Sequence, residues 1–196
     1  MVAAAGIKAA PGLPLDRVPV GWEVELLADR RELKEAVLWS PALATTGRRA
    51  TVFPGPHTLA TRSRSTGVPC APPGAFLLDP SPAVTRAGLV EELARDLGAW
   101  KLDPRIAFLS ADRPVPTPFG RLLRVDASLP WTLKGLRRAL RDRDVGTVEV
   151  RKRGSAVDVA DLTARLRLRG DARAVVVLTR VADRPWALVC TEERIS

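Results

Sequence analysis

The sequence GTVEVRKRGSAVDVADLTARLRLRGDARAVVVLTR, residues 146–180, alternates strand signals with a helix signal. β-branched residues at 147–151 are followed by a helical apolar pattern over 158–169 and by a second strand-like run at 174–180. Because Val175–Leu178 is apolar without interruption, we expect a central strand that is covered on both faces. The stretch therefore predicts a strand–helix–strand unit.

The flanking sequence extends this pattern in both directions. A strand is predicted at 121–127 and a helix at 132–143 before it, and another strand at 186–190 after it. Residues 119–196 thus predict the order β-α-β-α-β-β, which is typical of a compact two-layer α/β domain.

The first part of the chain has different signals. Strands are predicted at 6–10, 22–27, 35–39 and 50–53, with the second and third forming a β-hairpin. Residues 54–74 are rich in Pro and Gly and predict a loop or linker. A single helix is predicted over 82–97, opened by the Ser81-Pro82 pair and closed by Gly98. We therefore expect three regions, at 1–60, 61–118 and 119–196.

Composition limits the class of protein. The chain has 196 residues, of which 46% are hydrophobic, so it can bury a core and is neither disordered nor a small disulfide scaffold. It shows no apolar run long enough to span a membrane and no secretory signal, so we expect a cytoplasmic protein. Cys70, Cys190 and His57 lack zinc or redox spacing, and we predict no metal site.

Positive charge is concentrated in the second half. Residues 1–100 hold 11 basic and 10 acidic side chains, whereas residues 101–196 hold 20 and 12, out of a net charge of +9. Such an imbalance favours a polyanionic partner.

Two basic clusters are the candidate binding residues. The predicted helix at 132–143 carries four cations at helical spacing beside its apolar face, and the second cluster ends the strand before Gly154-Ser155, where backbone N–H groups could also hold phosphate. The candidates are Lys134, Arg137, Arg138, Arg141, Arg151, Lys152 and Arg153. An ordinary solvated surface explains the helix cations equally well. Arg165, Arg167 and Arg169 add charge near the next helix end, where they would equally complement its dipole.

Signals for catalysis are scarce. The sequence has no GxGxxG, GxxxxGK[ST] or HExxH motif, and His57 has no nucleophile or carboxylate at the spacing of a catalytic triad. We therefore assign no catalytic, cofactor-binding or metal-binding residue.

Five separate stretches carry a family resemblance. They are KAAPGLP (8–14), GWEVELLADRRELKEAVLW (21–39), PPGAFLLDPSPAVTRAGLVEELA (72–94), LDPRIAFLSADRPVPTPFGR (102–121) and VEVRKRGSAVDVADLTARLRLRG (148–170). In this order they resemble the C-terminal part of bacterial class I S-adenosylmethionine-dependent methyltransferases that end in a THUMP-like domain. The resemblance implies an α/β fold: the last strands of a Rossmann-like sheet, then a helical linker and a THUMP-like domain.

The resemblance also implies a function. THUMP domains occur in RNA-modifying enzymes, so it implies binding of RNA, commonly tRNA, through the basic half. The family's glycine-rich S-adenosylmethionine loop, acidic ribose ligand and catalytic segment have no counterpart in this sequence, so we expect an amino-terminally truncated member or a fragment, not catalytic alone. Two alternatives stay open: a methyltransferase component active with a separate cofactor-binding chain, and a non-catalytic homodimer paired through its exposed strands.

Overall fold

The computed structural model describes residues 4–62 and 67–193, and the chain forms two compact units. The first unit comprises Met1–Val68, Pro80–Gly98 and Thr117–Gly120. The second comprises Pro69–Asp79, Ala99–Pro116 and Arg121–Ser196. The chain therefore passes between the units more than once, and each unit is built from segments that are distant in sequence.

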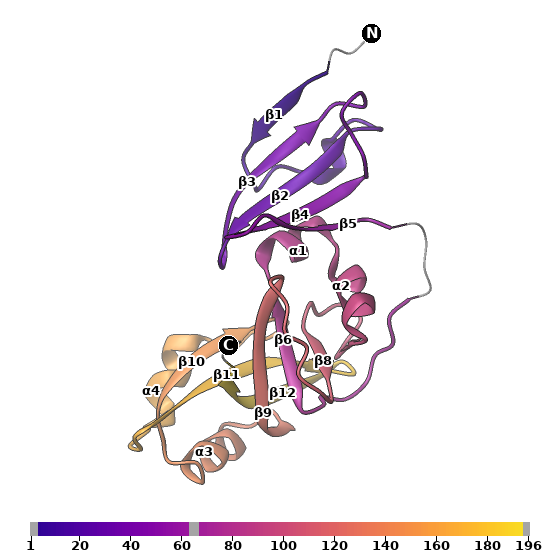
Figure 1. Cartoon of the computed structure of the whole chain (residues 1–196). Coiled ribbons are helices and arrows are strands. Elements are labelled where there is room, and N and C mark those ends of the chain that lie inside the picture. Colours follow the sequence, from indigo (N-terminus) through magenta and orange to yellow (C-terminus); the bar gives the residue numbers. More distant parts are fainter. Residues whose placement is uncertain (1–3, 63–66, 194–196) are drawn as a thin grey trace. The chain divides into compact units, whose positions relative to one another are not determined.

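The first unit contains a five-stranded mixed sheet in the order β1-β3-β2-β4-β5 (Figure 1). Its strands are β1 (Gly6–Ala9), β2 (Glu23–Asp29), β3 (Glu32–Trp39), β4 (Arg48–Phe53) and β5 (His57–Ala60). β2 runs parallel to β4, and the other neighbouring pairs are antiparallel. The β2–β3 hairpin confirms the predicted one. β5 corrects the prediction that residues 54–74 are all loop, because a four-residue strand lies between the Pro-rich turns.

The predicted helix at 82–97 is instead two helices, α1 (Pro82–Ala87) and α2 (Val90–Leu97). Gly88 separates them with a φ of 75°, a left-handed conformation that glycine adopts without strain and that ends an α-helix. The predicted ends are confirmed: the Ser81 hydroxyl accepts a hydrogen bond from Ala83 N at 3.3 Å, and Gly98 ends α2. The apolar periodicity alone did not reveal the break.

The second unit contains a seven-stranded mixed sheet in the order β10-β11-β12-β9-β6-β8-β7 (Figure 1). Its strands are β6 (Phe76–Pro80), β7 (Trp100–Lys101), β8 (Leu109–Ala111), β9 (Gly120–Pro130), β10 (Val145–Lys152), β11 (Ala172–Val181) and β12 (Arg184–Glu192). β10 runs parallel to β11, whereas β11–β12 and β12–β9 are antiparallel. The sheet is wider than the sequence pattern indicates, because β6, β7 and β8 extend it beyond the four predicted strands.

β11 lies inside this sheet and is buried on both faces, as its continuous apolar run predicts. Val175 and Val177 belong to a core that includes Phe108. Val176 and Leu178 belong to a second core, between the sheet and two helices. The alternation follows from the two-residue period of a strand.

Two helices supply the second of these cores, α3 (Leu133–Arg141) and α4 (Val159–Leu166). Leu136 and Leu140 on α3, and Leu162 and Leu166 on α4, are all buried against the sheet. The predicted order β-α-β-α-β-β is confirmed over β9 to β12. Within the described ranges, no helix has the length and apolar character needed to cross a lipid bilayer.

Candidate nucleic-acid interface

Helix α3 places its cations beside its buried leucines. Thr132 caps the helix, because its hydroxyl accepts a hydrogen bond from Gly135 N at 3.0 Å. Lys134, Arg138 and Arg141 are exposed, and Arg137 is half-buried. The four predicted helix candidates therefore flank the packed face, as their spacing indicates.

Arg137 also has a structural contact. Its Nε donates a hydrogen bond to the backbone carbonyl of Arg165 at 2.9 Å, and its Nη2 donates to the same oxygen. Arg165 lies in the last turn of α4, where carbonyl groups lack helical partners. Arg137 thus joins α3 to the end of α4 and keeps its positive charge and further N–H donors.

The other helix cations differ in their pairing. Arg138 lies 3.7 Å from Asp142, measured from Nε to Oδ2, with both side chains largely exposed. Such a surface pair contributes little energy and is screened by salt. Lys134 and Arg141 form no ion pair with any carboxylate among the described residues. Their charges remain available to an external anion.

The second candidate cluster contacts a buried carboxylate. Nε and Nη2 of Arg151 donate to Oδ2 of Asp79 at 3.0 and 2.6 Å, and Nη2 of Arg153 donates to Oδ1 at 3.0 Å. The Asp79 side chain is only 3% exposed. Arg153 also lies over the Phe108 ring, with 5.3 Å between its Cζ and the ring centroid. The Asp79 carboxylate thus compensates one of the two guanidinium charges. Arg151 and Arg153 therefore have a structural role within the second unit, and one positive charge remains uncompensated.

The turn between β10 and α4 uses its own polar groups. Lys152 Nζ donates to the carbonyl of Val157 at 2.9 Å, and Ser155 Oγ accepts from Val157 N at 3.3 Å. Asp158 caps α4, since its carboxylate accepts a hydrogen bond from Asp161 N at 2.8 Å. An acidic side chain therefore already occupies this helix N-terminus, where the sequence suggested that phosphate could bind.

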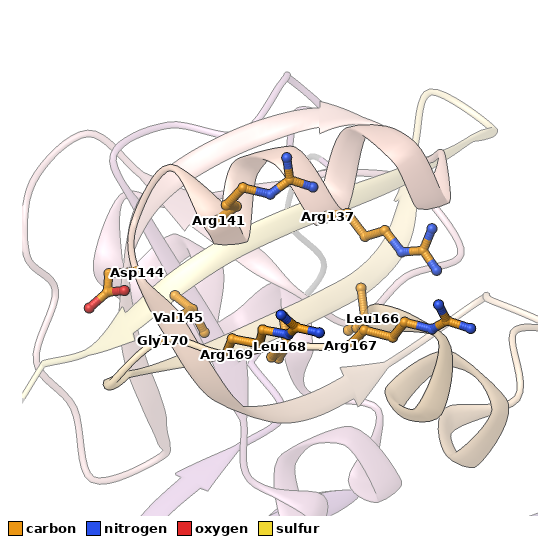
Figure 2. Close-up of a pocket in the computed structure, with 9 residues that line it drawn as sticks. All are labelled: Arg137, Arg141, Asp144, Val145, Leu166, Arg167, Leu168, Arg169 and Gly170. Carbon is orange, nitrogen blue, oxygen red and sulfur yellow. The ribbon is translucent and has the colours of Figure 1, made fainter.

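A basic pocket of about 240 Å³ lies between α3 and the segment that follows α4. Figure 2 shows arginines on both sides of it, Arg137 and Arg141 from α3 and Arg167 and Arg169 from the segment after α4. The remaining lining residues are Asp144, Val145, Leu166, Leu168 and Gly170. We call this the arginine pocket. It joins Arg137 and Arg141, which are predicted binding residues, to Arg167 and Arg169, for which complementing the helix dipole is an equal alternative.

Arg167 and Arg169 enter the pocket because α4 ends earlier than predicted. Arg167 has a φ of 50° and ends the helix, so residues 167–169 no longer follow helical spacing. In the sequence RLRLR at 165–169, arginine alternates with leucine at the two-residue period of extended chain. That alternation is the signal that could have separated these residues from the helix.

Two buried charged side chains, those of Arg121 and Asp103, lie elsewhere in the second unit. The Arg121 guanidinium, with its side chain 8% exposed, lies 2.7 Å from both Glu149 and Glu192, measured to the nearest carboxylate oxygen. Burial opposes its charge, but the hydrogen bonds that it donates to the Glu149 and Glu192 carboxylates outweigh this and raise the pKa of Arg121. The guanidinium joins β9 to β10 and β12 and is therefore structural.

Asp103 is the second of these buried charged residues. It accepts hydrogen bonds from the backbone N–H groups of Arg105 and Asp183, each at 2.9 Å. The Arg105 N–H bond lowers the pKa of Asp103 most; burial opposes it, and the Asp183 N–H and the charges of Arg105 and Arg180 lower it further. This carboxylate holds the β11–β12 turn against the loop before β8.

The described residues offer little for metal or nucleophilic chemistry. No group of three His, Cys, Asp or Glu side chains in residues 4–62 and 67–193 could hold a metal ion. His57 lies on β5 and is exposed. Cys70 and Cys190 are not joined, and burial raises the pKa of the Cys190 thiol to about 12. Cys190 is therefore a packing residue rather than a nucleophile.

Comparison with known proteins identifies both the domain and its relatives. Residues 120–192 match the family model described as THUMP domain-like. Two proteins from strains CDC 1551 and H37Rv of Mycobacterium tuberculosis, each named as an uncharacterized S-adenosylmethionine-dependent methyltransferase, are 38% identical over 198 residues. These matches cover 96% of this chain and 54% of each relative, so the chain spans about half the length of the curated relatives.

A solved structure supports the fold. The crystal structure of a candidate methyltransferase from Porphyromonas gingivalis W83 superposes with a TM-score of 0.77 at 19% identity. It matches 97% of this chain and 51% of that protein. The sequence relatives show that the chain is homologous to proteins named as S-adenosylmethionine-dependent methyltransferases over about half of their length, and residues 120–192 form a THUMP-like domain.

Proposed function

We propose that this chain is the RNA-binding portion of an S-adenosylmethionine-dependent methyltransferase that acts on RNA, with tRNA as the first class to test. In this proposal the second unit holds the RNA, and the sheet of the first unit continues the methyltransferase sheet of the longer relatives. The observation that carries the proposal is the arginine pocket, in which four guanidinium groups line one small cavity.

The energetics of these cations favour an external anion. Helix α3 places Arg137 and Arg138 beside Arg141, and like charges at such spacings repel by about 0.2–0.5 kcal/mol per pair. Arg141, Arg167 and Arg169 have no ion-pair partner among the described residues. A phosphate backbone would relieve this repulsion, and guanidinium groups hold phosphate through paired N–H donors.

The described residues do not form a cradle for S-adenosylmethionine. In the first unit the parallel pair β2 and β4 is connected through β3, without a glycine-rich turn that leads into a helix. Such a turn is what binds a nucleotide-like cofactor in a Rossmann-like sheet. We therefore assign no cofactor contact and no methyl-transfer step to these residues.

Filter binding to tRNA tests the proposal. The double variant Arg141→Glu and Arg169→Glu should weaken tRNA binding by about 100-fold, because each reversal removes one charged contact worth about tenfold. The control is Arg113→Glu, which reverses one charge at an exposed residue of the same unit outside the arginine pocket. Equal loss in both variants, or no binding by the wild-type chain, would refute RNA binding at this site.

Calorimetry with S-adenosylmethionine tests the alternative that the chain binds the cofactor itself. We expect no heat of binding for the chain alone. Stoichiometric binding would contradict the assignment and favour a cofactor-binding methyltransferase component.

A further inference from the structure

The arginine pocket differs in its charge balance from the paired arginines near it. Outside it, Arg138 pairs with Asp142, Arg165 with Asp161 at 3.2 Å, and Arg151 and Arg153 with Asp79. Among the described residues that line it, Asp144 supplies the single carboxylate, and its Oδ2 accepts a hydrogen bond from Asp171 N at 3.4 Å. Figure 2 shows Asp144 at the opposite end of the pocket from the guanidinium groups of Arg137 and Arg167. Four positive charges therefore face at most one negative charge.

The backbone around the pocket is held in place. Asp144 O accepts a hydrogen bond from Ala172 N at 2.9 Å. A Cβ atom at Gly146 would collide with the Gly170 backbone, and one at Gly170 would collide with the Asp144 backbone. The Arg137 contact with Arg165 ties α3 to the end of α4 as well. A pocket whose walls are already fixed loses little conformational freedom when it binds an anion.

The size and lining favour a small anion over a base. A pocket of about 240 Å³ lies below the range of about 300–1,000 Å³ that is typical of sites for drug-sized ligands. None of the described lining residues is aromatic, so the pocket offers no platform on which a base could stack. The apolar groups of Val145 and Leu166 are buried beside it, and their low polarity strengthens charge interactions.

We propose that the arginine pocket binds a terminal phosphate monoester of an RNA strand. An internal phosphodiester carries one negative charge, whereas a monoester carries about 1.5–2 at pH 7 and has three strong acceptor oxygens. The monoester therefore matches four guanidinium groups better than an internal linkage does. The inference rests on the proposed RNA-binding function and specifies which part of the RNA this pocket holds.

The test compares three RNA hairpins of one sequence, which end in a 5′-phosphate, a 3′-phosphate or hydroxyl groups only, with an internal fluorescent label. Fluorescence anisotropy on the full chain at fixed salt should show one phosphorylated hairpin binding about tenfold tighter than the hydroxyl hairpin. The tighter phosphorylated hairpin identifies which strand end is the source of the monoester.

Variants separate the pocket from the general surface. The double variant Arg141→Ala and Arg169→Ala should bind all three hairpins with equal affinity, weaker than that of the wild-type chain. An unchanged circular dichroism spectrum shows that this variant is folded. Arg113→Ala should retain the full preference. Equal affinity of the wild-type chain for all three hairpins would overturn this inference and leave the proposed function intact. Failure to bind any hairpin would overturn both.

Discussion

Arg137 on α3 donates two hydrogen bonds from one guanidinium group to the backbone carbonyl of Arg165 at the end of α4. The contact connects two helices that pack on the same sheet and positions one wall of the arginine pocket. One candidate RNA-binding residue is therefore also a structural residue, and substitutions of it have two effects that must be measured separately.

Replacing Arg137 should lower stability. Arg137→Ala removes both hydrogen bonds to the Arg165 carbonyl, and because the contact is partly exposed to solvent we expect a loss of about 1 kcal/mol. The control Arg138→Ala removes only a long, exposed pair with Asp142 and should change stability by less than about 0.5 kcal/mol. Urea denaturation measures both, and equal midpoints for the two variants would contradict the structural role of Arg137.

Asp79 should contribute more to stability than the exposed Asp142 does. Asp79→Asn removes the buried negative charge shared by Arg151 and Arg153, and we expect a loss of about 1–3 kcal/mol in the free energy of unfolding. The control is Asp142→Asn at an exposed position, which should be nearly neutral. If thermal or urea unfolding shows no loss of stability in Asp79→Asn, the Arg151–Asp79 contact contributes little to the free energy of unfolding.

Stability should fall in acid partly through Asp103. Its pKa is lowered below the ordinary value of 3.8 in the folded chain, so the ionised carboxylate stabilises the fold above that value. This contribution is lost as the pH falls through the lowered pKa. Asp103→Asn should therefore lower the free energy of unfolding by about 1–3 kcal/mol at pH 7, and this difference from the wild-type chain should become smaller below pH 3.8. A difference that stays constant from pH 7 to pH 3 would contradict this role of Asp103.

The two thiols should differ in reactivity. Burial raises the pKa of Cys190 to about 12, whereas Cys70 is exposed. At pH 8 a thiol reagent should label one cysteine per native chain and two in denaturant. Cys70→Ser should remove the native labelling. Rapid labelling of two thiols in the native chain would show that Cys190 is accessible.

Local periodicity explains which parts of the fold the sequence could predict. The runs that form β9 to β12 and the apolar stripes of α3 and α4 depend on neighbouring residues, and both element type and order were predicted correctly. The break at Gly88 was missed because a single left-handed residue leaves the apolar pattern intact. β5 and β6 were missed because both are short and lie among prolines.

The candidate site also depends on contacts that local sequence patterns do not predict. The helical spacing of Arg137 and Arg141 could be read from the sequence, but their meeting with Arg167 and Arg169 depends on where α4 ends. The pairing of Arg151 with Asp79 joins residues 72 positions apart, and local patterns carry no information about such contacts. Long-range pairing therefore decides which of the predicted cations remain available to an external anion.

The salt dependence of RNA binding reports how many phosphate groups the basic surface contacts. If six to eight phosphates are contacted, a plot of log affinity against log salt should have a slope of about −4 to −7. Arg141→Ala with Arg169→Ala should make this slope shallower by about 2, while Arg113→Ala leaves it unchanged. A wild-type slope near zero, or an unchanged slope in the double variant, would show that the arginine pocket does not bind RNA phosphate.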